Sequence, residues 1–448
     1  MIWLGQNYKI PASLNVLCIL FINFVLPSTM VSVFQTLLWK NHLESNPYLD
    51  NANNNVNITT EDNMSTNVTL HTPTTNSTST WQTITIQSIE DAKKAFIATQ
   101  GVKMSSIFIC KMAVQFVTGL FVGPLIDRIG YKVTMFAGTV VMSLSAIGFA
   151  LAKSYPALFV SVAIQGIGAS CNVVGGMTML ARTATDKNIR ANVIRLSLLS
   201  ILLGAATGLW SGEFVDTFHD KTVSFLILAG VIALHSFFLL LFNIPKIERN
   251  EETKQPAAVL LRLDDYTLTA LVVLVLLGVV LGTITDAFSG SGVDLSYCQI
   301  VLVVFFAPCG LYLVTATILI RNPTYSLCRV MGLILGFLII IFLLISFALS
   351  LRTSPTNASI FAISFGIALV AANIYPDLAY VAEENHDSNY AAVYALADVA
   401  LNFGIITGVL VTSGIMPGFC VLPLLLFFMP YAFGLYIDCA SSNHPSLV

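Results

Sequence analysis

The stretch Gly123-Pro124-Leu125-Ile126-Asp127-Arg128-Ile129-Gly130-Tyr131-Lys132 decides the fold, because it is a short charged turn between two long apolar runs. Glycine lets two helices approach closely and reverse direction within a few residues. Asp127 can accept hydrogen bonds from a neighbouring helix N-terminus, while Arg128 and Lys132 hold the turn in cytoplasmic water. The stretch therefore predicts a tight cytoplasmic connection between two membrane-spanning helices.

The composition also indicates a membrane protein. Of the 448 residues, 56% are hydrophobic and only 10% are charged, whereas a soluble domain needs far more charge to cover its surface. The net charge of -3 shows no basic excess, so we expect no nucleic acid partner. The sequence shows no phosphate loop, nucleophile elbow or metal-ligand spacing, so we expect no enzyme activity, no cofactor and no metal.

Twelve apolar stretches have about the length that crosses a bilayer core of ~30 Å. They predict an all-α membrane protein with twelve transmembrane helices in two six-helix halves. The halves are residues 1–245 and 263–448, joined by a charged cytoplasmic linker at 246–262. The predicted spans are 14–39, 105–125, 132–152, 156–180, 191–214, 223–244, 266–288, 298–320, 327–349, 360–381, 391–412 and 420–437.

Basic residues and glycosylation sequons indicate the orientation. The connections after the second, fourth, sixth and eighth spans carry most of the Lys and Arg, so the positive-inside rule places both termini in the cytoplasm. The loop at 40–100 then lies on the other side, and its Asn, Ser and Thr content predicts a disordered, solvated segment. All the sequons fall on this non-cytoplasmic side, as N-glycosylation requires: Asn57, Asn63, Asn67, Asn76 and Asn357.

Two charged residues lie deep in the predicted spans, where an unpaired charge costs ~2.5–3.5 kcal/mol on insertion scales. Lys111 precedes Gly123 by twelve residues, or ~18 Å of helix, and Asp398 follows Asp387 by eleven, or ~16 Å. These matching depths predict an ion pair across the two halves that opens and closes as the halves rock. The alternative is that Lys111 snorkels toward the lumenal surface and Asp398 binds only neighbouring hydroxyl groups.

Three further residues are candidates for binding a substrate or a proton. Asp286, near the lumenal end of the seventh span, can hold a cation or exchange a proton, or it is an acid already in lumenal water. Asn23 and Asn373 lie close to Pro27 and Pro376, where a break in a helix can turn backbone carbonyls toward a cavity. The alternative for both prolines is a tolerated kink.

Three stretches carry a family resemblance: 108–138; Gln165-Gly-Ile-Gly168-Ala-Ser-Cys171, which continues to Gly176-Met-Thr-Met-Leu-Ala181; and Tyr390-Ala-Ala-Val-Tyr394-Ala-Leu-Ala-Asp398-Val-Ala400. Together they resemble the vesicular amine transporters, the branch of the major facilitator superfamily that loads monoamines or acetylcholine into secretory vesicles. The resemblance implies the major facilitator fold and a charge pair between Lys111 and Asp398. It also implies a monoamine or related cation as the solute, coupling to protons, and a secretory or synaptic vesicle membrane, with the plasma membrane as the alternative.

Other positions depart from the pattern of that family. The acid that meets the substrate ammonium falls on Ile22, the acid used in proton coupling on Ala371, and an Arg of the fourth span on Val162. The glutamate of the seventh span falls near Thr285, beside Asp286. Without both acids a cation loses charge-assisted contacts worth about 1.5–3 kcal/mol each. Three functions therefore stay open: a proton-coupled amine antiporter, an uncoupled facilitator of a neutral solute, and a non-transporting scaffold or receptor derived from a transporter.

Overall fold

The computed structural model describes residues 10–45, 67–70, 82–152, 154–184, 186–218, 221–241, 265–290, 310–314, 335–336, 338–339, 357–385 and 389–412. Helices dominate this part of the chain, as expected. The elements are α1 (Ile10–Ser45), β1 (Asn67–Leu70), β2 (Gln82–Thr85), α3 (Ile86–Ile129), α4 (Tyr131–Leu151), α5 (Tyr155–Thr183), α6 (Lys187–Phe218), α7 (Lys221–Leu241), α8 (Asp265–Gly290), α11 (Asn357–Asn385) and α12 (Tyr390–Thr412).

Within the described residues, nine helices are long and apolar enough to cross a membrane. They coincide with nine of the twelve predicted spans, so these nine predictions are confirmed as helices. The predicted spans at 298–320, 327–349 and 420–437 lie mostly or wholly outside the described residues, as does the linker at 246–262.

The prediction of a disordered loop at 40–100 is wrong in part. β1 and β2 pair in antiparallel register with Asn67 opposite Thr85, and α3 begins directly afterwards at Ile86. The physical reason lies in residues that the polar composition of the loop obscured. Thr and Ile alternate at 83–86 and favour a strand, and the segment 90–97 is rich in Glu, Ala and Lys, which favour a helix. Of the five sequons, Asn67 begins β1 and Asn357 begins α11, while the other three lie outside the described residues.

The turn between α3 and α4 is as tight as the sequence predicts. Gly130 is the only residue between the two helices, and its N–H donates to the Ile126 carbonyl at 2.8 Å. Its φ of 88° lies in the left-handed region, which a residue with a Cβ adopts only at a cost. One glycine is therefore sufficient to reverse the chain here.

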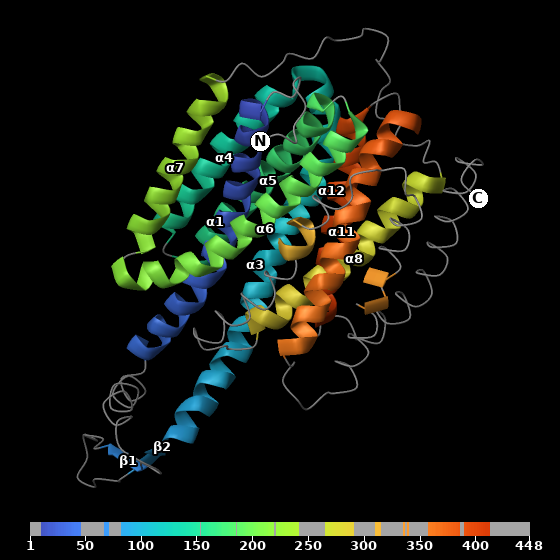
Figure 1. Cartoon of the computed structure of the whole chain (residues 1–448). Helices are drawn as coiled ribbons and strands as arrows, with labels where there is room; N and C mark the ends of the chain where they lie inside the picture. The colour runs from blue at the N-terminus through green and yellow to red at the C-terminus, as the bar shows by residue number, and fades with distance from the viewer. Residues whose placement is uncertain are drawn as a thin grey trace.

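The helices form two groups that lie side by side (Figure 1). In the N-terminal group, which comprises α1 and α3–α7, α1 packs on α6 and α4 packs on α5 and α7. In the C-terminal group, which comprises α8, α11 and α12, α8 packs on α12. The groups meet where α12 contacts α3 and α5, and where α11 contacts α6. The long α3 continues beyond the bundle to the β1–β2 hairpin (Figure 1).

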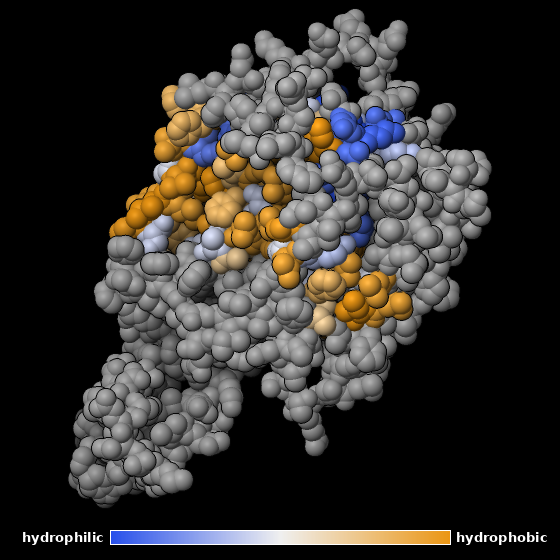
Figure 2. Space-filling model, viewed as in Figure 1, coloured by the Kyte–Doolittle hydropathy of each residue, from blue (hydrophilic) through white to orange (hydrophobic). Residues whose placement is uncertain are grey.

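A large hydrophobic core joins the two groups, while other apolar side chains face outward. The core includes Val174 of α5, Leu274 of α8 and Val393 of α12, all buried. On the outer surface, α7 exposes Ile227 and Leu234, and Figure 2 shows an apolar patch over this helix. Outward-facing apolar side chains of this kind are suited to contact with lipid.

Candidate functional site

A buried carboxylate of the C-terminal group is held by two side chains of the N-terminal group. Asp398 of α12 is only 4% exposed. Its Oδ1 accepts a hydrogen bond from Gln115 Nε2 of α3 at 2.9 Å, and its Oδ2 accepts one from Ser170 Oγ of α5 at 3.0 Å. We call Gln115, Ser170 and Asp398 the Asp398 cluster. The cluster connects three helices across the boundary between the two groups.

Lys111 lies one helical turn before Gln115 on α3 and is also buried. It interacts electrostatically with Asp398. Within the described part of the chain no direct ion pair joins the two residues, and the side chains that donate to the carboxylate oxygens are Gln115 and Ser170. The structure thus brings Lys111 and Asp398 into one neighbourhood, with Gln115 as the direct partner. Their role as a gating pair stays a prediction.

Two glycines of α3 allow the close approach that brings Gln115 to Asp398. A Cβ on Gly119 would lie 2.9 Å from Val399 Cγ2, and a Cβ on Gly123 would lie 3.1 Å from Ala395 Cβ and 3.3 Å from the Ala391 carbonyl oxygen. Gly123 belongs to the charged turn that the sequence singles out. In the structure Gly123 lies within α3, seven residues before the reversal at Gly130, and it serves contact between the two groups of helices.

The charged residues of the turn are arranged differently from the expectation. Asp127 forms an ion pair with Arg182 at the end of α5, at 3.8 Å, so a side chain rather than a helix N-terminus is its partner. Arg128 is exposed and Lys132 is half-buried. The Asp127–Arg182 contact places the α3–α4 turn and the α5–α6 connection at the same end of the bundle. We call this the turn end, which the sequence predicts to be cytoplasmic.

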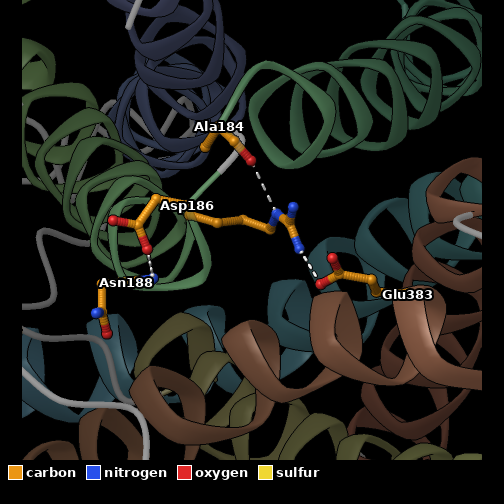
Figure 3. Close-up of polar contacts among 5 residues, drawn as sticks. Ala184, Asp186, Asn188 and Glu383 are labelled. Carbon is orange, nitrogen blue, oxygen red and sulfur yellow. Dashed lines mark hydrogen bonds and ion pairs between the residues drawn. The ribbon is translucent and has the colours of Figure 1, made fainter. Parts of the chain in front are cut away.

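A second polar contact joins the two groups at the turn end (Figure 3). Arg190 Nη1 of α6 lies 2.6 Å from Glu383 Oε2 of α11, and Arg190 Nε donates to the Ala184 carbonyl at 3.1 Å. The same guanidinium lies over the Tyr390 ring of α12, 5.3 Å from the ring centroid. In Figure 3, Ala184 and Glu383 lie on opposite sides of the guanidinium, which dashed lines join to both.

The sequence interpretation missed four buried polar residues: Gln115, Ser170, Arg195 and Asp377. Arg195 and Asp377 are buried charges in the described spans, and each lies only four residues inside the end of its predicted span. A search for charges near span ends as well as at mid-membrane would have found both. Gln115 and Ser170 are neutral, and nothing in the chain's order shows that they face Asp398.

The other predicted residues do not join the Asp398 cluster by any hydrogen bond found among the described residues. Asn23 of α1 is 3% exposed, and its Oδ1 has no partner in that part of the structure. Asn373 of α11 is buried and donates from Nδ2 to the Leu369 carbonyl at 2.7 Å, within its own helix. Asp286 lies in α8, but its side chain is outside the described residues.

Three positions at which the resemblance implies an acid or a base, Ile22, Val162 and Ala371, have apolar surroundings. Val162 is 1% exposed, and Ile22 packs against the same hydrophobic cluster. Ala371 packs against the main core. Thr285 donates to the carbonyl of Leu281, one turn earlier in its helix. Ile22, Val162, Ala371 and Thr285 themselves carry no charge, and the side chain of the neighbouring Asp286 lies outside the described residues.

The long apolar helices, packed in two groups, are typical of a multi-pass membrane protein. A sequence model of the Major Facilitator Superfamily matches residues 73–435, and the chain belongs to this family. The human organic anion transporter MFSD10 (TETRAN) has a similar structure, with a TM-score of 0.63 over 95% of this chain and 98% of that one. At 14% identity this likeness concerns the fold alone.

Within the superfamily, the chain is similar to vesicular amine and acetylcholine transporters, which confirms the resemblance seen in its sequence. It is 29% identical to the human synaptic vesicular amine transporter over 314 residues, which cover 70% of this chain and 61% of that protein. It is 26% identical to the vesicular acetylcholine transporter of Tetronarce californica over 336 residues, which cover 71% of this chain and 63% of that protein. The chain thus spans less than two thirds of the length of these relatives.

Proposed function

We propose that this protein is an alternating-access transporter whose two groups of helices rock about the Asp398 cluster. The observation that carries the proposal is that one buried carboxylate of the C-terminal group accepts hydrogen bonds from two helices of the N-terminal group. Separating the groups removes both donors, and a buried charged group left without partners is strongly disfavoured. Asp398 must then find another partner, either a solute or a proton.

The solute that we propose is a small organic cation, such as a monoamine or acetylcholine, moved into vesicles. An ammonium group can replace Gln115 and Ser170 as the partner of the Asp398 carboxylate while the groups separate. Relatives named as amine and acetylcholine transporters favour this solute class. In this mechanism the Lys111 ammonium pairs with Asp398 when the solute leaves, and so acts as the gate.

Proton coupling follows from the same carboxylate. When Asp398 takes up a proton it loses its charge and an acceptor site, so it no longer holds a cation. Alternation between a proton and a cation on Asp398 makes the protein an antiporter. Asp286, near the far end of α8, is a second candidate for proton exchange, and Asn23 and Asn373 are candidates for polar contact with the solute.

An uncoupled facilitator of a neutral solute is the second candidate function. The apolar packing of Ile22, Val162 and Ala371 favours it, because these positions offer no charge to a cation. The same apolar positions are compatible with a non-transporting scaffold or receptor. Both alternatives make the Asp398 cluster a structural contact between the helix groups.

Uptake into liposomes that contain the purified protein separates these functions. We expect labelled monoamines or acetylcholine to accumulate more under an imposed pH gradient, and we expect Asp398→Asn to abolish this increase. Gly230→Ala is a matched control, because Gly230 lies in α7 with open space around it. Uptake that ignores the gradient contradicts the antiporter, and binding without uptake favours a receptor.

A charge exchange tests the proposed gating pair. Lys111→Asp and Asp398→Lys should each impair transport, and the double variant should recover part of it if the two side chains meet during the cycle. A double variant no better than either single variant removes the direct pair from the mechanism.

We also propose that the protein is glycosylated on the lumenal side of a secretory or synaptic vesicle membrane, with the plasma membrane as the alternative. Glycosidase treatment should then increase the mobility of the protein on a gel, and replacement of the sequon asparagines by Gln should remove that shift. The residues to replace are Asn57, Asn63, Asn67, Asn76 and Asn357.

A further inference from the structure

Pro376 interrupts the backbone hydrogen bonding of α11, and a side chain from the other group of helices takes the carbonyl that it frees. Pro376 lies inside α11 and has no N–H, so the carbonyl of Ala372, four residues earlier, lacks its usual helical donor. Arg195 Nε of α6 donates to that carbonyl at 3.2 Å. The contact therefore joins the N-terminal group directly to the break in α11.

The surroundings of Arg195 suit a fixed rather than a passing contact. Arg195 is 2% exposed, and its Nη1 donates to Asn192 Oδ1, one turn earlier in α6, at 3.1 Å. This second bond orients the guanidinium, whose planar donors are rigid. A buried carbonyl without a partner costs about 1–3 kcal/mol, so the arginine stabilises a conformation of α11 that is otherwise unfavourable.

The other side of the break is held from within the C-terminal group. The carbonyl of Tyr375, the residue before Pro376, accepts a hydrogen bond from Tyr394 Oη of α12 at 3.2 Å. Asp377, the residue after Pro376, is completely buried. Side chains of α6 and α12 thus hold two carbonyls of the interrupted segment, one from each group of helices.

The Arg195 contact lies deeper in the bundle than the Arg190–Glu383 ion pair. Both contacts join α6 to α11, and Arg190 lies closer than Arg195 to the start of α6 at the turn end. The two arginines differ in what they bind. Arg190 binds a carboxylate near the end of α11, whereas Arg195 binds backbone that is available only because of Pro376.

We propose that Arg195 is a positioning residue that closes the turn end by holding α11 at its proline break. While the contact with the Ala372 carbonyl persists, α6 and α11 stay together. When it breaks, α11 bends at Pro376 and the groups part at this end. The role in transport rests on the proposed alternating access, but the closure itself is measurable without any solute.

The test is a cycle of substitutions at Arg195 and Pro376. Arg195→Leu leaves the Ala372 carbonyl without a partner and should favour the open turn end. Pro376→Ala supplies an N–H that can donate to the Ala372 carbonyl within α11, so Arg195→Leu should have little effect in that background. A matched control is Arg190→Leu, whose effect should be the same with Pro376 or Ala at this position, because Arg190 does not contact the break.

The readout is the rate at which a maleimide modifies Ala392→Cys in the purified full-length protein, followed by mass spectrometry of the peptide that carries this residue. Ala392 is half-buried, and its Cα lies 3.5 Å from the position of a Cβ on Gly123, so separation of the groups exposes it. We expect Arg195→Leu to raise the rate about tenfold with Pro376 present, as for loss of a hydrogen bond to a charged group. In the Pro376→Ala background we expect Arg195→Leu to change this rate by no more than about twofold, because the backbone N–H at position 376 then donates to the Ala372 carbonyl.

Two results would overturn the proposal: an unchanged rate in Arg195→Leu, or an equal increase in both backgrounds. If Arg195→Leu alone fails to fold, recovery of folded protein in the Arg195→Leu and Pro376→Ala double variant supports the proposal, and continued failure contradicts it. The protein could give the expected labelling rates and yet show no uptake. That result would support the proposal about Arg195 and reject the proposed transport function.

Discussion

Gly123 of α3 and Ala395 of α12 meet at the boundary between the two groups of helices, where a Cβ on the glycine would lie 3.1 Å from the alanine Cβ. The contact lies between the charged turn and the Asp398 cluster. It sets the distance between α3 and α12, and therefore whether Gln115 reaches Asp398. A helical glycine from the charged stretch at 123–132 thus contributes to the geometry of the buried polar cluster.

Gly123→Ala should weaken the contact between the groups. The added methyl group must displace Ala395 or the Ala391 carbonyl, and overpacking of this kind costs about 1–3 kcal/mol. We expect a lower melting temperature and reduced uptake. Ala395→Gly in the same protein removes the facing methyl group and should restore part of both. No recovery in the double variant would mean that Gly123 acts in some other way.

Gln115→Glu should be among the most damaging single substitutions in α3. It places a second carboxylate 2.9 Å from Asp398 Oδ1, in a site where both side chains are buried. An uncompensated buried charge costs about 3–5 kcal/mol. Adding Asp398→Asn returns the site to one carboxylate and one amide, so the double variant should recover most of the thermal stability.

Stability of the Gln115 and Asp398 variants is measured separately from uptake, because the double variant moves the carboxylate to α3. We expect the Gln115→Glu and Asp398→Asn double variant to fold, but we expect its uptake no longer to respond to a pH gradient. Equal melting temperatures for Gln115→Glu and the wild type would contradict the hydrogen bond as the main interaction of Gln115.

Exchange of Arg190 and Glu383 tests the contact at the turn end. Glu383→Arg places two guanidinium groups together, and Arg190→Glu places two carboxylates together, so each single variant should open this end. The double exchange restores opposite charges, and coupling energies for such pairs are about 0.5–3 kcal/mol. We expect partial recovery of uptake, limited by the loss of Arg190's contacts with Ala184 and Tyr390. Additive effects of the two single variants would exclude direct coupling.

The sequence predicts the helices well because their signal is local. Length and apolar composition identify the nine spans found among the described residues, and the charged stretch at 123–132 predicts the reversal that occurs at Gly130. The β1–β2 hairpin and the early start of α3 were missed, since short strands and a polar helix resemble a disordered loop in composition. In these segments, propensity at individual positions was more informative than average polarity.

The candidate site is only partly predictable, because its contacts join residues far apart in the chain. Depth along each helix brings Lys111 and Asp398 to the same level, but depth does not give the direction in which a side chain points. Gln115, one turn further along the face that carries Lys111, therefore takes the position that the sequence assigned to the lysine. Pro376 was recognised as a possible break in α11, but its partner Arg195 follows only from the packing of α6 on α11.

Gly130 and Gly230 provide a comparison that isolates backbone conformation from packing. A Cβ would meet nothing within 4 Å at either glycine, but only Gly130 has a positive φ, of 88°. Gly130→Ala forces an alanine into a backbone conformation, φ 88° and ψ 152°, that is essentially restricted to glycine, which costs roughly 1–3 kcal/mol. Gly230→Ala, inside α7, should instead stabilise the helix by about 0.5–1 kcal/mol. Thermal unfolding of the two variants in the same detergent should therefore shift the melting temperature in opposite directions, and a Gly130→Ala melting temperature equal to or above that of the wild type would contradict the role of φ at Gly130.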